Sequence, residues 1–191
     1  MPEKRNRKAT TVTAPVFDRT NVFVVAGLGN PDPNFAATYH NIGRRMLERL
    51  STPLRDAGWH TKDDFYYTKN ETMVFVIPRT YMNESGSAVL HALRYFKTKP
   101  ESLLVIHDDA DLPSGSWKLG FGRGSAGHHG IESLIRVLRT KNFWRARIGV
   151  RGDDTREKAG TFVLKRVRRA DEEAFEKVFQ ELNSLLTTPQ T

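Results

Sequence analysis

Short apolar runs alternate with amphipathic stretches along this chain from residue 21 onwards. Runs such as residues 22–28 (VFVVAGL) are almost wholly apolar, which is typical of strands buried on both faces of a sheet. Apolar residues at helical spacing, such as Ile42 and Met46, predict helices with one buried face. The predicted strands lie at residues 22–28, 65–68, 73–77, 103–106, 117–121 and 145–150, and the predicted helices at 41–54, 83–96, 129–138 and 171–186. This alternation predicts a layered α/β domain.

The length and composition favour a single domain over residues 21–191. With 191 residues, the chain is long enough to bury a core that needs no disulfide or metal to fold. No repeat, low-complexity segment or second-domain boundary interrupts the pattern. The chain has no cysteine, which excludes disulfides, thiol catalysis and thiolate metal sites. No apolar run approaches the roughly 20 residues that a membrane helix needs.

Residues 1–20 lack apolar periodicity and are predicted to form a flexible basic tail. Their content of Thr, Lys and Arg also fits a mitochondrial transit peptide. Glu3, Asp18 and the lack of an amphipathic helix argue against that alternative. We therefore expect a cytoplasmic protein, with a mitochondrial location as the second possibility.

Basic residues are concentrated in one block of the sequence. The net charge of the chain is +8, and residues 117–169 contain 14 basic and 4 acidic residues. Such a block is typical of proteins that bind a polyanion, with nucleic acid as the first candidate and an acidic membrane surface as the second. From charge alone, a basic solvated surface without a partner is an equal alternative.

Two motifs resemble ligand sites but do not meet the requirements of those sites. Residues 122–127 (GRGSAG) match a dinucleotide-binding loop, but such a loop follows the first strand and precedes an acidic residue by about 20 positions. The glycines instead let the backbone pass close to a ligand, and Arg123 indicates an anionic one. Residues 107–111 (HDDAD) could bind a divalent metal, but neighbouring strand side chains point to opposite faces and would not converge. We predict no metal and no cofactor.

Four polar residues at the ends of predicted strands and helices are stronger candidates. Asn30 follows the first strand, Asp108 follows the strand at 103–106, and His40 and Asn83 stand at helix starts. These positions share one rim of a parallel sheet, where α/β proteins place their chemistry. A histidine, a carboxylate on its far nitrogen and two amides together could hydrolyse an ester with activated water. Taken singly, each residue fits a helix cap or turn better.

Several short motifs, in order along the chain, resemble those of the bacterial-type peptidyl-tRNA hydrolase family. They are VAGLGNP (25–31), FAATYHN (35–41), TYMNESG (80–86), IHDDADLP (106–113), GHHG (127–130), RIG (147–149) and FVL (162–164). Their common order and spacing make the resemblance, which spans about residues 22–187, far more specific than any one motif. It implies a single α/β domain with a mixed, mostly parallel sheet flanked by helices.

The resemblance also implies an activity and a set of site residues. The activity is hydrolysis of the ester between a peptide and the 3′ ribose of tRNA, which recycles tRNA from stalled translation. It implies that His40 is the general base and that Asp108 holds it, with Asn30 near the reacting carbonyl and Asn83 on the substrate. The substrate-binding and tRNA-binding candidates are Phe35, Asn41, Tyr81, Met82, His128, His129, Lys118, Arg123 and Arg147. We expect a monomer that contacts the acceptor arm, the T arm and the nascent peptide of peptidyl-tRNA.

The chain departs from the family pattern at four positions. The family usually has Asn at His129, Arg at Tyr39, Tyr at Phe35 and a second Lys at Gly120. None of these changes removes the base or its acid, so we expect an active enzyme with altered affinity. Two rivals stay open: an inactive RNA-binding or ribosome-associated paralogue, and a hydrolase of small acidic esters or amides.

Overall fold

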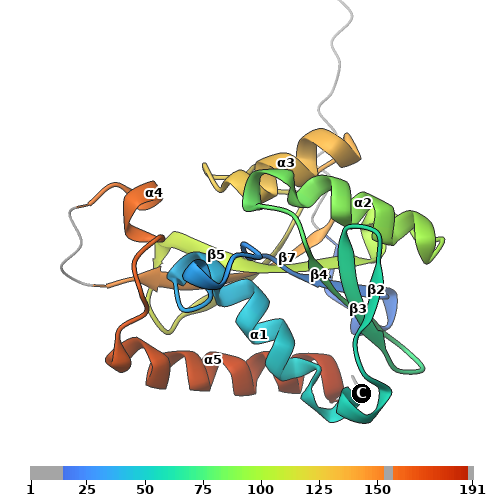
Figure 1. The fold of residues 1–191 in the computed structure, drawn as a ribbon, viewed down its shortest axis with the longest axis horizontal. Coiled ribbons are helices and arrows are strands. Elements are labelled where there is room, and N and C mark those ends of the chain that lie inside the picture. Colours follow the sequence, from blue (N-terminus) through green and yellow to red (C-terminus); the bar gives the residue numbers. More distant parts are fainter. Residues whose placement is uncertain (1–14, 153–156, 189–191) are drawn as a thin grey trace, which may run out of the picture.

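The computed structural model describes residues 15–152 and 157–188 of the chain. Seven strands in these residues form one sheet in the order β2-β3-β4-β1-β5-β7-β6 (Figure 1). The strands are β1 (Val24–Gly27), β2 (His60–Lys62), β3 (Phe65–Lys69), β4 (Val74–Pro78), β5 (Leu103–Pro113), β6 (Trp117–Phe121) and β7 (Trp144–Arg151). The central strands β4, β1, β5 and β7 are parallel, and antiparallel pairs complete both edges. The predicted mixed sheet is therefore confirmed.

Helices cover both faces of this sheet. In Figure 1, helices α2 (Ser85–Tyr95) and α3 (His129–Leu138) lie on one face, and α1 (Ile42–Leu50) and α5 (Arg169–Thr187) lie on the other. A single short turn, α4 (Ala159–Phe162), precedes α5. The 3-10 turns are η1 (Arg19–Asn21), η2 (Pro33–Phe35), η3 (Tyr39–Asn41), η4 (Thr52–Ala57), η5 (Met82–Glu84) and η6 (Pro100–Ser102). Two of them, η3 and η5, carry candidate site residues.

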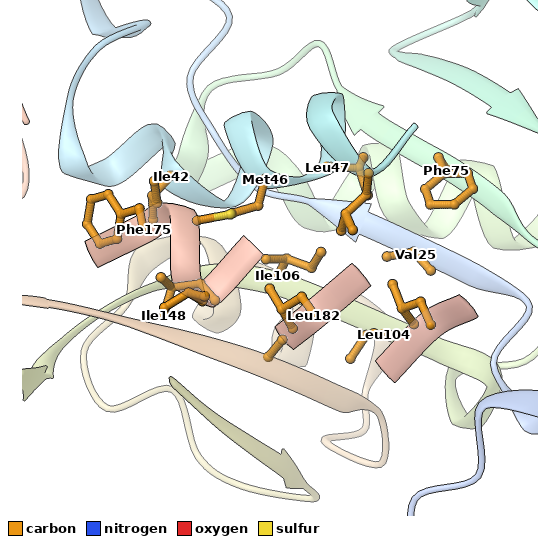
Figure 2. Close-up of a cluster of buried hydrophobic side chains, with 14 of the residues drawn as sticks. Val25, Ile42, Met46, Leu47, Phe75, Leu104, Ile106, Ile148, Phe175 and Leu182 are labelled. Carbon is orange, nitrogen blue, oxygen red and sulfur yellow. The ribbon is translucent and has the colours of Figure 1, made fainter. Parts of the chain in front are cut away.

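The core has two layers because successive strand residues point to opposite faces. Val25 and Ile106 pack with Met46 of α1 and Phe175 of α5 (Figure 2). The alternate residues of the same strands, such as Ala26, belong to the second layer with α2 and α3. This two-sided burial explains why the first apolar run shows no alternation of polar and apolar residues.

Gly43 allows α1 to lie directly against strand β5. A Cβ atom at Gly43 would overlap the carbonyl oxygen of Ile106, so no larger residue fits this crossing. His40 lies three residues before Gly43, and Asp108 lies two residues after Ile106. The close crossing therefore brings the candidate base and its acid together.

Four elements differ from the sequence prediction. The strand predicted to end at residue 106 continues to Pro113, so Asp108 lies inside β5 rather than after it. It continues because β7 pairs with it through Asp109, while the polar side chains find partners at this end of the sheet. The helix predicted at 41–54 ends at Leu50, because Pro53 has no N–H to donate to the carbonyl of Arg49 and its ring would clash with that carbonyl in a continuing α-helix. Strand β2 and helix α4 are too short to show a period and were not predicted.

The predicted tail is described only in part. Residues 1–14 lie outside the described residues, but residues 15–20 are included. Phe17 packs edge-on against Trp144, with ring centroids 4.9 Å apart. Within the described ranges, none of the helices combines the length and apolar character needed to cross a bilayer.

Candidate active site

His40 and Asp108 form a buried pair on the sheet. The Nδ1 atom of His40 lies 2.9 and 3.0 Å from the two carboxylate oxygens of Asp108. An ionised carboxylate only accepts hydrogen bonds, so we infer that Nδ1 carries a hydrogen and that Nε2 carries the lone pair. Among the described residues, Nε2 of His40 has no hydrogen-bond partner. This nitrogen is therefore available to take a proton.

A second histidine, His128, holds the same carboxylate. Its Nε2 lies 2.9 Å from Oδ1 of Asp108. Its Nδ1 caps helix α3 by accepting the backbone N–H groups of Gly130 and Ile131, at 3.1 and 3.3 Å. Because Nδ1 accepts, the hydrogen of the neutral ring must be on Nε2, which donates to Asp108. His128 was predicted to bind substrate or tRNA, and no local sequence pattern indicates its contact with Asp108.

The pKa values of the pair are shifted in opposite directions. Burial alone would lower the pKa of His40, but the charge and hydrogen bond of Asp108 outweigh it and raise the pKa above 6.5. Burial alone would raise the pKa of Asp108, but His40 and His128 outweigh it and hold the pKa below its ordinary value. Burial, followed by the charge of His128, lowers the pKa of His107, so this neighbour stays neutral at neutral pH. The site thus keeps an ionised carboxylate behind a histidine that titrates above 6.5.

Two asparagines form a rigid unit next to the histidines. The side chain of Asn41 accepts the backbone N–H of Asn30 at 2.9 Å and donates to the carbonyl of Asn30 at 3.0 Å. The side-chain oxygen of Asn30 accepts the backbone N–H of Met82 at 2.8 Å. No other described residue accepts from the NH₂ group of Asn30, which is therefore free to donate. Met82 belongs to η5, so the same contact places the neighbouring residue Asn83 at this rim.

Gly130 joins the asparagine side of the site to the histidine side. A Cβ atom at Gly130 would lie 2.5 Å from the sulfur of Met82, closer than real Cβ contacts allow, and 3.0 Å from the ring of His128, which is tighter than most real contacts. Glycine at this position thus leaves room for the side chains of Met82 and His128 at the start of α3. The predicted residues His40, Asp108, Asn30 and Met82, though distant in sequence, belong to one connected set of contacts.

A cleft of about 240 Å³ opens beside the pair. Its lining includes His40, Asp108, His128 and His129, together with Ala159 of α4 and Val163, which directly follows α4. The side chain of His129 is 71% exposed. Asn30, Asn41 and Met82 are buried beside this cleft's residues but do not line it. Tyr81 is exposed just before η5, Asn83 is exposed on η5 and Phe35 is half-buried in η2, and these three do not line the cleft either.

Cationic side chains gather on the neighbouring strands β6 and β7. Lys118 is exposed and pairs in register with Arg147. The Nε atom of Arg147 lies 2.6 Å from Oδ2 of Asp109, which holds it in place. Arg145, which sequence analysis did not single out, is buried and donates to the carbonyl of Gly124 at 2.8 Å. Burial and then the charge of Arg147 lower the pKa of Arg145 to about 10, and the nearby Arg123 adds to the effect.

One group of side chains within the described ranges has the composition of a metal site. Ligand atoms of His40, Asp108 and His128 all lie within 4.8 Å of one another. A metal would need a lone pair on Nε2 of His128, but this nitrogen carries the hydrogen while Nδ1 caps the helix. The hydrogen bonds therefore suit a proton-transfer site better than a metal site.

The chain is similar to known proteins over most of its length. A family model described as Peptidyl-tRNA hydrolase matches residues 24–190. The peptidyl-tRNA hydrolase of Haemophilus influenzae is 36% identical over 169 residues, which cover 85% of this chain and 87% of the relative. That of Pseudomonas putida is 38% identical over 160 residues, with 81% and 82% covered. Among solved structures, peptidyl-tRNA hydrolase from Acinetobacter baumannii matches with a TM-score of 0.75 at 27% identity, covering 87% of each chain.

Proposed function

The chain belongs to the peptidyl-tRNA hydrolase family, and on that premise we propose how its own residues hydrolyse the ester of peptidyl-tRNA. The family and its activity were both predicted from the sequence and are confirmed by these relatives. None of the relatives supports the inactive paralogue. The roles of individual residues and the way tRNA binds are our proposals.

His40 acts as the general base. Its Nε2 takes a proton from water, and the resulting hydroxide attacks the ester carbonyl. Asp108 orients the ring through Nδ1 and stabilises the imidazolium that forms. The imidazolium then returns the proton to the 3′ oxygen of the leaving ribose. The observation that carries this proposal is the 2.9 Å contact between Nδ1 of His40 and the carboxylate of Asp108.

Asn30 and Asn83 stabilise the oxyanion of the tetrahedral intermediate. Asn30 presents its NH₂ group because Met82 occupies its side-chain oxygen. Asn41 acts through Asn30, since both ends of its amide bind the Asn30 backbone. The exposed ring of Tyr81 and the side chains of Met82 and Phe35 complete the substrate surface in this proposal.

His128 is a positioning residue for Asp108. Without His128, the ring of His40 would be the only described side chain that fixes the angle of the carboxylate. Helix α3 fixes the ring of His128 through its cap, and the ring in turn fixes Asp108. His129 lies at the cleft mouth, where we propose that it contacts the substrate in place of the usual asparagine.

The tRNA binds across the cationic strands beside the cleft. Lys118, Arg123 and Arg147 contact phosphates of the acceptor and T arms, a mode that reads no base sequence. One chain supplies all of the proposed catalytic residues, His40, Asp108, Asn30 and Asn83, so the proposed chemistry requires no second copy and we retain the expectation of a monomer. Such a substrate places the protein in the compartment of translation, for which we retain the cytoplasm as the first choice.

Release of the peptide from N-blocked aminoacyl-tRNA tests this function. We expect rapid cleavage of N-acetyl-aminoacyl-tRNA and slow cleavage of the free aminoacyl form. Deacylated tRNA added as a competitor should inhibit the reaction, because the cationic strands bind tRNA itself. Cleavage that is indifferent to tRNA would instead support a hydrolase of small esters.

A further inference from the structure

A buried cluster of hydrogen bonds lies next to the catalytic pair. The hydroxyl of Tyr39 donates to Oδ2 of Asp171 at 2.5 Å, and the hydroxyl of Ser114 donates to Oδ1 at 2.6 Å. The Nε atom of Arg168 donates to the same carboxylate at 2.8 Å. Asp171 is 5% exposed and Tyr39 is 1% exposed. A carboxylate so buried is stable only when donors satisfy it, and these three side chains do so.

The cluster connects the two segments that carry the catalytic pair. Tyr39 directly precedes His40 in η3, and Ser114 directly follows β5, the strand that contains Asp108. Asp171 lies in the first turn of α5, far away in the sequence. One carboxylate of α5 therefore ties the segment of the base to the strand of its partner.

The same cluster borders the wall of the cleft. The backbone N–H of His40 donates to the carbonyl of Val163 at 2.8 Å, and that of Tyr39 donates to Lys165 at 3.1 Å. The ring of Tyr39 stacks on Phe162, with centroids 4.7 Å apart. Phe162 ends α4, and Val163 lines the cleft. The position of the Tyr39 ring thus affects both the backbone of His40 and the part of the cleft lining at Val163.

The cluster holds the protonation states that it needs at neutral pH. Burial, and then the hydrogen bond to Asp171, raise the pKa of Tyr39, so its hydroxyl keeps its hydrogen. Burial alone would raise the pKa of Asp171, but hydrogen bonds from Arg168, Ser114 and Tyr39 outweigh it and lower the pKa. The donor and the acceptor are therefore both in the required form.

We propose that Tyr39 and Asp171 are positioning residues for the hydrolysis, which fix His40 against Asp108 and the α4 segment against the cleft. The inference rests on the proposed role of His40 as the general base. It gives helix α5 a part in positioning His40, although none of the described side chains of α5 lines the cleft. The hydroxyl of Tyr39 is the link through which α5 acts.

Tyr39→Phe tests the inference, because it removes the hydroxyl and keeps the ring that stacks on Phe162. Well below the melting temperature, we expect kcat to fall about 3- to 10-fold while KM changes less than about twofold. The acid limb of the kcat profile should move to lower pH, since a looser contact with Asp108 raises the pKa of His40 less. Asp171→Asn should show the same changes. The double variant, Tyr39→Phe with Asp171→Asn, should have a kcat no lower than that of the less active single variant, because both changes break the same link.

Glu176→Gln is the matched control. It breaks the exposed ion pair between Arg49 of α1 and Glu176 of α5, at 2.6 Å, which also anchors α5 but lies away from the cluster. We expect its kcat and its pH profile to equal those of the wild type. If Tyr39→Phe lowers only the melting temperature and keeps the wild-type kcat and pH profile, the cluster is merely structural and the inference is overturned.

Ser114→Ala is the second test of the inference, to be used if Tyr39→Phe does not fold. It removes one donor to Asp171 from outside the His40 segment, and a wild-type kcat in this variant would also overturn the inference. The wild type is assayed on N-acetyl-aminoacyl-tRNA in the same series. Failure of the wild type to cleave that substrate overturns the proposed function, whereas equal cleavage by wild type and variants overturns only the role of the cluster.

Discussion

The side-chain oxygen of Asn30 lies 2.8 Å from the backbone nitrogen of Met82 and accepts its hydrogen. This bond settles the orientation of the amide, because only the oxygen can accept. The NH₂ group is left to donate from a side chain that belongs to a residue only 7% exposed. A buried, fixed donor of this kind stabilises an oxyanion without reorganising during the reaction.

Asn30→Asp should separate the two ends of this amide. The aspartate keeps an acceptor for the N–H of Met82 but replaces the NH₂ donor with a negatively charged oxygen. We expect kcat/KM for N-acetyl-aminoacyl-tRNA to fall about 10²- to 10³-fold, the usual cost of losing an oxyanion donor. Circular dichroism should show an unchanged fold. Activity within threefold of the wild type would mean that Asn30 does not face the reacting carbonyl.

Asp108→Asn should change the pH dependence as well as the rate. In the wild type, Asp108 raises the pKa of His40 above 6.5, and His40 must be neutral to act as a base. Activity should therefore rise with pH through an apparent pKa above 6.5. Without the charge, burial dominates and lowers the pKa of His40, so the acid limb of kcat/KM should move to lower pH while the plateau falls about 10²-fold or more. An acid limb that moves to higher pH would contradict the pairing.

His128→Asn distinguishes the helix cap from the support of Asp108. Asparagine is among the preferred N-cap residues, so the melting temperature should change little. Its shorter side chain does not reach the carboxylate, which loses the 2.9 Å hydrogen bond. We expect kcat to fall about 10-fold with little change in KM. A rise in KM with an unchanged kcat would indicate direct substrate binding, the role that the sequence suggested.

Lys118→Ala should weaken tRNA binding without changing the chemical step. Lys118 is exposed, so its removal does not leave a buried charge unpaired. Removal of Arg147, in contrast, would leave the buried carboxylate of Asp109 without its cationic partner. We expect KM to rise and the slope of log KM against log salt to decrease by about one unit. Lys69→Ala is the control, since this exposed lysine lies on β3 near the opposite edge of the sheet. A fall in kcat alone would argue against a phosphate contact.

Periodicity predicted the long elements correctly because their buried faces repeat at a fixed interval. The apolar face of α5, with Phe175, Val178 and Leu182, is visible in the sequence and is buried in the structure. The extension of β5 beyond Ile106 was not predicted because its residues there are polar. Their side chains form hydrogen bonds with partners such as His40 and Arg147. Such partners come from distant segments, which no local pattern contains.

In the site, too, some contacts could be predicted from local sequence patterns and others could not. Asn30, His40 and Asp108 could be placed near one another because strand ends share a rim of the sheet. The contact between Tyr39 and Asp171 joins residues 132 positions apart and has no signal in either local sequence. The role of His128 depends on which ring nitrogen caps α3, and only the geometry of the helix start reveals it.

The single-turnover rate of His40→Ala on N-acetyl-aminoacyl-tRNA tests the central claim most directly. Loss of the general base should lower this rate at least 10²- to 10³-fold while tRNA still binds. His91→Ala is a matched control, because His91 also pairs with an aspartate, Asp64, at 3.0 Å but on the exposed side of α2. We expect the control to react at the wild-type rate, whereas near-normal turnover by His40→Ala would contradict the proposed mechanism.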